Sequence, residues 1–434
     1  MLHLSTFKRG GVHPDDRKEL SKNSPIEVLP VPHTLVVPMS QHLGAPAQLV
    51  KARGDEVRRG ELIGQASSFV SANVHSPVRG KIVDVTTVRL ANGATCQAAV
   101  IQPDEIQGDE FTVRHDWQQE SPESLLATIR EMGIVGMGGA TFPTHVKLAT
   151  QGKKVEALVI NAVECEPYLT SDYRSMLERA DETIEGIRII AKILSPQKII
   201  IGVEANKLDA AAHMEERLAT LKVTGIEIQP LKMKYPQGDE KQLLKATMGR
   251  EVPSGKLPID IGAVVCNIGT VYAVWEAVVF HKPLIERVVT VSGEAVATPR
   301  NVLCPVGTRT GDLLAFCGGS AEDADRLISG GPMMGFAFAD ENAPVTKGTS
   351  GILALKAENI ETGVCVSCGK CVAHCPMGLM PNRMFRNIKY GRYQEALDLG
   401  LLDCKECGCC AFICPAHLPL VQGFKLGKKM GRRK

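Results

Sequence analysis

The spacing of hydrophobic and polar positions changes along the chain and predicts segments of different secondary structure. Between residues 26 and 115, short apolar runs such as residues 80–85 alternate with turn signals such as Asn92-Gly93. Short strands at regular spacing, separated by turns, are typical of a small β barrel or sandwich. We therefore expect an all-β domain near the N-terminus.

Strand-like and helix-like segments then alternate from about residue 120 to residue 280. Apolar runs predict strands at residues 155–161, 198–203, 223–228 and 261–266, and helical spacing of apolar positions predicts helices at residues 124–132, 177–194 and 210–221. This alternation indicates a mostly parallel sheet with helices on both faces. Residues 285–350 return to β character with many glycines, which predicts a second small β domain.

Composition places the chain among multidomain proteins and argues against one class of function. A chain of 434 residues with 44% hydrophobic residues is expected to fold as two to four domains. The 50 basic and 48 acidic residues nearly balance, which argues against nucleic-acid binding as the main role. Neither a signal peptide nor an uninterrupted apolar run long enough to span a bilayer is recognisable, so we expect a cytoplasmic protein, soluble or peripheral to a membrane.

The last ten residues depart from this balance. Six of them are basic: Lys425, Lys428, Lys429, Arg432, Arg433 and Lys434. Such a tail can contact an anionic membrane or an acidic partner, and the alternative is a solvated, disordered end.

Fourteen cysteines carry the strongest chemical signal. In a cytoplasmic chain they do not indicate disulfides, and nine of them lie between Cys365 and Cys414. They form two copies of the C-x2-C-x2-C-x3-C-P run of bacterial ferredoxins, in which the fourth cysteine ligates the other cluster. We therefore assign two crossed ligand sets: Cys365, Cys368, Cys371 and Cys414 for cluster one, and Cys404, Cys407, Cys410 and Cys375 for cluster two.

Two alternatives to these ligand sets exist. Cys409 could compete with Cys410, but only Cys410 repeats the spacing of the first motif. Paired CxxC motifs also bind zinc, although zinc sites do not require the x3-C-P ending that both copies have. The 28 residues between the motifs contain helix-like runs at 383–389 and 393–399. An α-helical two-cluster ferredoxin domain is expected.

Two loops in the α/β segment are candidates for binding a nucleotide. The first is glycine-rich, at residues 136–143, and matches neither a Rossmann fingerprint nor a P-loop, but bare backbone amides cradle phosphate and Lys147 follows. The second, residues 161–167, is acidic and follows a predicted strand, where ligands bind in α/β sheets. A plain glycine turn and a solvated acidic loop are the alternatives. Cys165 has no base beside it in the sequence, so we do not expect it to be a nucleophile.

Residues 125–280 resemble the FMN- and NADH-binding domain of the complex I flavoprotein subunit. The segments that carry this resemblance are the two loops together with residues 235–240 and 266–270. The resemblance implies that FMN contacts come from Gly136, Gly138, Lys147, Asn161, Tyr235, Gly238, Asp239, Asn267 and Thr270. It also implies that Gly139, Phe142, Glu164 and Glu166 face the dinucleotide. The chain departs from that family at three positions: Val163 replaces an acidic residue, Asp239 replaces a glutamate and Cys266 replaces an asparagine.

Residues 54–82 resemble a biotinyl/lipoyl-type hammerhead domain. Phe69 stands where those domains carry the modified lysine, so we expect the fold without the modification.

The chain resembles the RnfC (RsxC) family over nearly its whole length. The segments that carry this resemblance are residues 10–14 with Lys18, and residues 41–46, 330–335 and 344–351. The resemblance implies a multidomain protein of α/β and β domains in a fixed order: a hammerhead (barrel-sandwich) domain at 1–115, a parallel α/β FMN/NADH domain at 116–282, an SLBB β-grasp domain at 283–352, a ferredoxin domain with two [4Fe–4S] clusters at 353–424 and a basic tail at 425–434. We interpret the glycine-methionine segment 330–335 as a packed loop without a chemical role.

The same resemblance implies a function. It predicts a peripheral subunit on the cytoplasmic side of the plasma membrane that carries electrons between NAD(H), flavin and two clusters. The predicted partners are a ferredoxin-like cluster subunit and integral membrane subunits that translocate an ion. The alternatives are a soluble flavin-linked NADH oxidoreductase similar to cobalamin reductases and a non-enzymatic module that only holds clusters.

Overall fold

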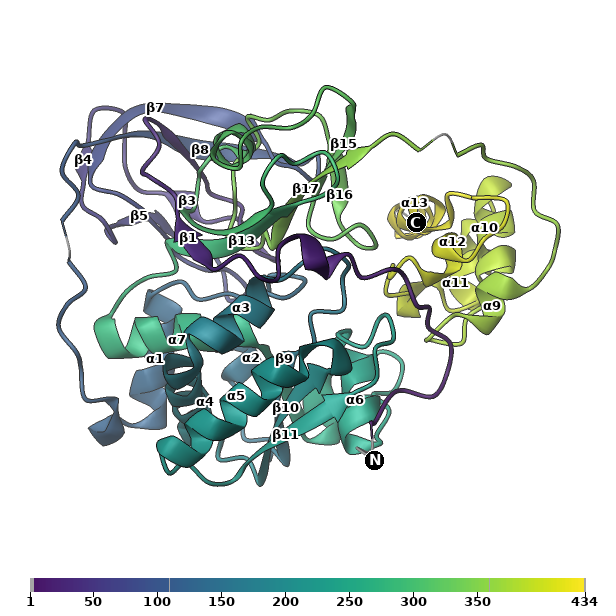
Figure 1. Cartoon of the computed structure of the whole chain (residues 1–434), viewed down its shortest axis with the longest axis horizontal. Helices are drawn as coiled ribbons and strands as arrows, with labels where there is room; N and C mark the ends of the chain where they lie inside the picture. Colours follow the sequence, from purple (N-terminus) through teal and green to yellow (C-terminus); the bar gives the residue numbers. More distant parts are fainter. Residues whose placement is uncertain (1–3, 109, 359, 433–434) are drawn as a thin grey trace.

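The computed structural model describes residues 4–108, 110–358 and 360–432. Figure 1 shows two β-rich domains beside an α/β domain, with a small helical domain that holds the C-terminus on one side. The N-terminal segment, drawn in purple, runs across several of these domains before the first of them begins. Among the described residues, none of the helices is both long and apolar enough to traverse a bilayer.

The N-terminal β domain is built from two small sheets. The first has the order β2-β8-β7-β4, and the second has the order β3-β5-β6. Their strands are β2 (Leu35–Pro38), β3 (Gln48–Leu49), β4 (Glu56–Val57), β5 (Leu62–Gln65), β6 (Val74–His75), β7 (Gly80–Arg89) and β8 (Thr95–Pro103). Alternate apolar side chains, including Ile63, Ile82 and Ile101, fill the space between the sheets. Phe69 lies in the loop between β5 and β6 and is 65% exposed, at the tip expected from the hammerhead pattern.

The α/β domain has a four-stranded parallel sheet in the order β11-β10-β9-β12. Its strands are β9 (Ala157–Ala162), β10 (Lys198–Glu204), β11 (Ile226–Leu231) and β12 (Ala263–Asn267). One face packs against α1 (Pro122–Glu131), α4 (Ala180–Leu194), α5 (Leu208–Thr220) and α7 (Ile268–Phe280), and the other against α6 (Glu240–Met248). The predicted parallel sheet with helices on both faces is confirmed.

Two features of this domain differ from the sequence prediction. The helix expected over residues 177–194 is two helices, α3 (Ser171–Glu178) and α4. Arg179, which lies between them, is not helical. The sequence also did not predict α6 and α7. Helix α7 is apolar on nearly every side because it is buried between α1, α4 and the sheet, so it has little amphipathic period to recognise.

The second β domain is a six-stranded sheet in the order β1-β14-β13-β17-β15-β16. Its members are β1 (Ile26–Val28), β13 (Glu286–Ser292), β14 (Arg300–Pro305), β15 (Ala324–Ser329), β16 (Phe336–Phe338) and β17 (Gly351–Lys356), with α8 (Thr310–Phe316) packed on the sheet. Strand β1 comes from the N-terminal segment and pairs with β14 at the edge of the sheet. The sequence grouped residues 1–115 into one domain, and β1 is a departure from that grouping.

The residues before β1 also lie outside the N-terminal β domain. Residues 4–24, called here the N-terminal strap, pair at Ser5 with Leu231 and at Val12 with Tyr235 of the α/β domain. The Gly11 amide donates to the His374 carbonyl of the helical domain at 2.9 Å. The strap has no core of its own and binds through backbone hydrogen bonds to other domains, which local sequence patterns do not reveal.

The C-terminal domain is helical, as predicted from the spacer between the cysteine motifs. It contains α9 (Lys370–Ala373), α10 (Pro381–Lys389), α11 (Tyr393–Asp398), α12 (Cys409–Phe412) and α13 (Leu420–Gly431). Helix α13 continues through most of the expected basic tail. Gly427 is buried against Ile388, and the Lys428 ammonium donates to the Cys404 carbonyl at 2.7 Å. Residues 425–431 are therefore part of the domain and not a solvated end, whereas Arg433 and Lys434 lie outside the described residues.

Candidate flavin and cluster sites

The glycine-rich loop lies against the N-terminus of α7. Met137 donates its amide to the Thr270 hydroxyl at 2.9 Å, and a Cβ on Gly138 would lie 2.7 Å from the Asn267 Cβ. Gly136 closes the loop through its amide, which donates to the Phe142 carbonyl at 2.8 Å. Nothing lies within 4 Å of a Cβ on Gly139, so this part of the loop is open to a ligand.

Asn267 caps the N-terminus of α7 and links this helix to Asp172. Its side-chain oxygen accepts from the Gly269 and Thr270 amides at 2.9 and 3.3 Å, and its amide nitrogen donates to Asp172 at 2.7 Å. Burial, and then the nearby Glu164 carboxylate, raise the pKa of Asp172 to about 7. Asp172 was not predicted from the sequence as a site residue.

Lys147, on helix α2 (Thr144–Leu148), and Asp239, the residue before α6, both lie beside Glu240. The Lys147 ammonium donates to Glu240 at 2.8 Å and to the Val265 carbonyl at 3.0 Å. Asp239 caps α6 by accepting from the Lys241 and Gln242 amides, both at 3.1 Å. In this state the Lys147 ammonium is paired with the Glu240 carboxylate, and the first amides of α6 are occupied by the Asp239 carboxylate.

The acidic loop, residues 161–167, leaves the carboxyl end of β9 with a strained turn. Glu164 has φ 46, a conformation that residues other than glycine seldom adopt. Its carboxylate accepts from the Asp172 and Tyr173 amides at 2.7 and 3.3 Å, at the N-terminus of α3. Asn161 donates its side-chain amide to the Gly238 carbonyl at 2.8 Å, which joins this loop to residues 235–240. The structure thus brings the predicted flavin residues of separate segments together.

Glu166 points away from α3, toward the other domains. Its carboxylate accepts from the Tyr235 hydroxyl at 3.1 Å and from the Met333 amide at 3.0 Å. Burial raises the pKa of Glu166 to about 7. Both acids of the loop that were expected to face a dinucleotide are therefore already bound to protein donors.

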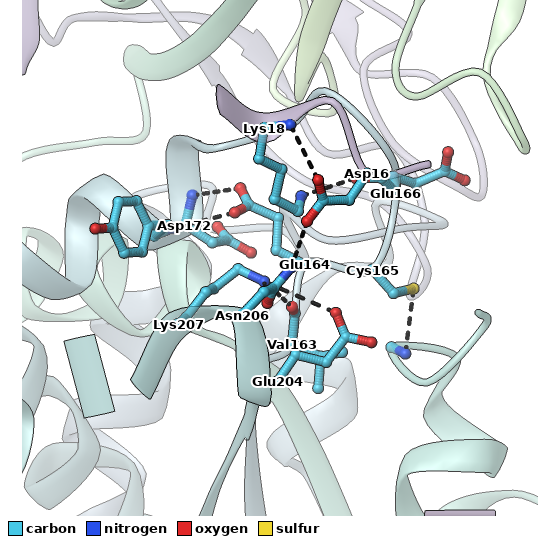
Figure 2. A network of polar contacts seen from close by, with 12 residues as sticks. Asp16, Lys18, Val163, Glu164, Cys165, Glu166, Asp172, Glu204, Asn206 and Lys207 are labelled. Atoms are coloured by element: carbon cyan, nitrogen blue, oxygen red, sulfur yellow. Dashed lines mark hydrogen bonds and ion pairs between the residues drawn. The ribbon is translucent and has the colours of Figure 1, made fainter. Parts of the chain in front are cut away.

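Two buried lysines, Lys18 and Lys207, bind the acidic loop, as Figure 2 shows. The Lys207 ammonium donates to the Val163 carbonyl and to the Asn206 side chain, both at 2.8 Å, and the Lys18 ammonium donates to the Glu166 carbonyl at 2.9 Å. Glu204 lies 3.8 Å from the Lys207 ammonium. Sequence reasoning did not select Lys207 or Glu204, although their place just beyond the carboxyl end of β10 is where site residues of such sheets gather.

The cysteines assigned to cluster two line one cavity. Cys375, Cys404, Cys407 and Cys410 all line this cavity, whose other walls are mainly apolar. The Cys404 and Cys375 sulfurs accept from the Glu406 and Leu379 amides, both at 3.4 Å. Four thiols around one apolar space, with amides directed at the sulfurs, fit a [4Fe–4S] cluster.

The cysteines assigned to cluster one lie nearer the surface. Cys365 and Cys368 are exposed, while Cys371 and Cys414 are half-buried. Burial raises the pKa of Cys371, and the neighbouring Cys414 and Cys365 raise it further, so the first motif meets the last cysteine of the second. Within the described ranges, no three Cys, His, Asp or Glu side chains are arranged for a single metal ion.

Comparison with known proteins identifies the family. The model of the RnfC barrel sandwich hybrid domain matches residues 5–106. The chain is 46% identical to a subunit of the proton-translocating ferredoxin:NAD(+) oxidoreductase complex of Clostridium ljungdahlii, over 92% of this chain and 88% of that protein. It is 42% identical to a subunit of the ion-translocating oxidoreductase complex of Rhodobacter capsulatus, over 98% of this chain and 83% of that protein. The chain belongs to the RnfC family.

A further RnfC-family relative comes from a complex named as Na(+)-translocating. This subunit of the Na(+)-translocating ferredoxin:NAD(+) oxidoreductase complex of Acetobacterium woodii is 38% identical over 98% of this chain and 96% of its own length. The relatives thus match this RnfC-family chain nearly end to end.

Models of three more domain families match the chain after the barrel sandwich hybrid domain, in the predicted order. They are the Nuo51 FMN-binding domain at residues 129–276, the SLBB domain at 288–337 and the 4Fe-4S dicluster domain at 357–415. The predicted family, fold class and cofactors, FMN and two [4Fe–4S] clusters, are confirmed. The individual ligand residues stay predictions.

A solved structure has the same fold over much of the chain. It is an NAD+-reducing [NiFe]-hydrogenase in the H2-reduced state, with a TM-score of 0.51 and 19% identity over 73% of this chain and 62% of that chain. At this identity the likeness concerns the fold alone.

Proposed function

We propose that this chain is the peripheral NAD(H)-oxidising or NAD(+)-reducing subunit of an ion-translocating ferredoxin:NAD(+) oxidoreductase. The observation that carries this proposal is the direct contact between the flavin-side loop and the second cysteine motif. The Cys409 thiol, beside the cluster-two cysteines, donates to the carbonyl of Tyr235 at 3.8 Å. Near full-length relatives named as subunits of such complexes support it and disfavour the soluble cobalamin-reductase-like alternative.

The residues of the α/β domain have distinct roles in this proposal. The glycine loop around Gly139 and the Lys147 ammonium bind phosphate, while Asn161, Tyr235 and Asn267 line the flavin. The remaining predicted FMN contacts are Gly136, Gly138, Gly238, Asp239 and Thr270. The residues predicted to face the dinucleotide are Gly139, Phe142, Glu164 and Glu166. A flavin bound here would accept the two electrons of a hydride and pass them on singly, which suits clusters that each take one. No side chain here is needed as a nucleophile, and Gly238 donates its amide to the Cys165 sulfur at 3.2 Å.

The two cysteine sets differ in position, which gives each a proposed place in the electron path. The set around Cys404 is adjacent to Tyr235 and Asp239, so it exchanges electrons with the flavin. The set that includes Cys365 and Cys368 is exposed and faces the next redox partner. The sets are Cys404, Cys407, Cys410 and Cys375 for the inner cluster and Cys365, Cys368, Cys371 and Cys414 for the outer one.

The partners follow from the complex to which the relatives belong. We propose a ferredoxin-like cluster subunit and integral membrane subunits that move the ion, with this chain on the cytoplasmic side of the plasma membrane. We further propose that its domains meet near residues 116, 283 and 353, with residues 4–24 as a strap shared by several domains.

Anaerobic purification with iron, sulfide and flavin analysis tests this function. NADH added to the purified protein should bleach the flavin absorbance and produce the electron paramagnetic resonance (EPR) signal of a reduced cluster. A protein that holds both clusters, but neither binds FMN nor responds to NADH, would establish the non-enzymatic alternative.

A further inference from the structure

The loop between β15 and β16 has no role in the function proposed above, yet it lies where three domains meet. This SLBB loop, residues 330–335, has the sequence Gly-Gly-Pro-Met-Met-Gly. The Gly335 amide donates to the Gly331 carbonyl at 2.9 Å, and the Gly330 amide donates to the Gly351 carbonyl at 2.8 Å. The shape of the loop is thus fixed by its own backbone and by β17.

On one side the loop contacts the acidic loop of the flavin site. The Met333 amide donates to Glu166 at 3.0 Å, and the second oxygen of that carboxylate accepts from the Tyr235 hydroxyl at 3.1 Å. A Cβ on Gly331 would lie 2.2 Å from a Glu166 carboxylate oxygen. Only glycine at this position lets the loop approach so closely.

On the other side the same loop contacts the second cysteine motif. A Cβ on Gly408, between Cys407 and Cys409, would lie 2.8 Å from the Met333 carbonyl oxygen. The Met333 side chain packs against an apolar cluster formed by Val12, Tyr235, Cys407 and Cys409. One residue of the SLBB domain therefore contacts both a flavin-side carboxylate and the segment that carries cluster-two cysteines.

The N-terminal strap supports this junction from another direction. Val12 and Tyr235 exchange two backbone hydrogen bonds, each of 2.9 Å. The preceding residue of the strap, Gly11, donates to His374, the neighbour of the cluster-two cysteine Cys375. Backbone contacts of the strap thus link Tyr235 to the helical domain that carries the cysteines.

We propose that the SLBB loop is a positioning element that sets the separation between the flavin site and the second cluster, with Gly331 and Met333 as its positioning residues. The proposal rests on the proposed function. In the step concerned, one electron at a time passes from the reduced flavin to the cluster, so the flavin is oxidised and the cluster reduced. NADH is the source of the electrons, and no bond of the loop forms or breaks.

Two variants test the loop in the intact chain with its cofactors. Gly331→Ala forces the loop away from Glu166, and Met333→Ala removes the side chain that packs against the cysteine motif. Met334→Ala is the matched control, because its side chain is 46% exposed. Rapid-mixing EPR after NADH addition measures cluster reduction, and an artificial dye that takes electrons from the flavin measures the earlier step.

Both loop variants should retain wild-type FMN, iron and dye reduction, whereas cluster reduction by NADH should slow on the order of tenfold, since displacements near 1 Å are costly for positioned groups. Met334→Ala should match the wild type. If Gly331→Ala does not fold, Met333→Ala decides alone.

Wild-type cluster reduction in the folded loop variants would overturn the proposal. So would equal losses of dye reduction and cluster reduction, because the loop would then act on the nucleotide site itself. Failure of the wild-type protein to reduce its clusters with NADH would instead refute the proposed function.

Discussion

At the scale of single residues, the buried Lys207 is the clearest case of a charge that the acidic loop requires. Only 1% of Lys207 and 3% of Glu204 is exposed, and the ammonium is bound to the Val163 carbonyl. Lys207→Met would leave Glu204 and this carbonyl without their buried partner. We expect the free energy of unfolding to fall by about 3 kcal/mol, as for one broken buried pair. Lys198→Met, at the exposed start of β10, should change it by less than about 0.5 kcal/mol. Equal urea midpoints of the two variants would contradict this role.

Lys147 is the residue whose charge we assign to the flavin phosphate. Lys147→Ala should weaken FMN retention by about tenfold or more, the effect of one lost charge-assisted hydrogen bond. NADH-dependent dye reduction should fall with it while the EPR signal of chemically reduced clusters stays. The control is Lys153→Ala, since Lys153 also pairs with a carboxylate, Asp260, but near the surface at 2.6 Å. Unchanged dye reduction in Lys147→Ala would show that the glycine-loop assignment is wrong.

Glu166 should give the chain a pH dependence of known sign. Its pKa in the folded protein is about 7, raised from 4.5 by burial, so between these values the folded state keeps a proton that the unfolded state loses. This stabilisation is present below pH 4.5 and is lost as the pH rises through 7. Glu166→Gln removes it, so from pH 5 to pH 8 the variant should gain about 2–3 kcal/mol relative to the wild type. Parallel pH profiles of thermal unfolding would contradict a raised pKa.

At the scale of elements, the sequence predicted what depends on local spacing. The cysteine ligand sets were predicted from cysteines that lie three or four residues apart in the sequence. Asn161 was predicted as a site residue from its position at the end of a strand. The partners of Glu166 did not follow, because Met333 lies 167 residues away and Lys18 lies 148 residues away. The strap and β1 escaped prediction for the same reason, since only long-range backbone pairing fixes them.

The crossing of the two cysteine motifs is the element-scale prediction that remains to be tested. Cys414→Ser should remove the cluster held by Cys365, Cys368 and Cys371 and lower the iron content by roughly half. Its EPR spectrum should match that of Cys365→Ser. The control is Cys409→Ser, which changes a buried cysteine outside both sets and should keep both clusters. Selective loss of the Cys404 cluster in Cys414→Ser would refute the crossed ligation.

At the scale of the whole molecule, the contacts of the strap and the SLBB loop join the α/β, SLBB and helical domains at Tyr235. Electron carriers on separate domains need such fixed contacts, because interfaces between domains of one chain are otherwise prone to relative motion. The exposed cysteines of the outer set and the basic face of α13, formed by Lys425, Lys429 and Arg432, belong to the same helical domain. The surface that meets the rest of the complex is therefore expected on this domain.

The basic face of α13 is where membrane attachment of the whole molecule can be tested. Lys428 is committed to Cys404 and Glu406 within the domain, whereas Lys425, Lys429 and Arg432 are exposed. Each exposed basic residue contributes about 1 kcal/mol of attraction near an anionic membrane surface. Changing these three to Gln, with Lys428 kept, should release the chain from isolated membranes at lower salt than the wild type requires.

The control for that experiment removes the same charge elsewhere on the surface, at Lys81, Lys198 and Lys256, which are exposed. This control should stay on the membranes as firmly as the wild type, because electrostatic attraction fades beyond a Debye length of about 8 Å at physiological salt. Equal release of both triple variants would mean that net charge, and not the face of α13, governs attachment. Retention of both at every salt concentration would mean that contacts with the integral subunits hold the chain, and α13 would then have only its structural role around Cys404.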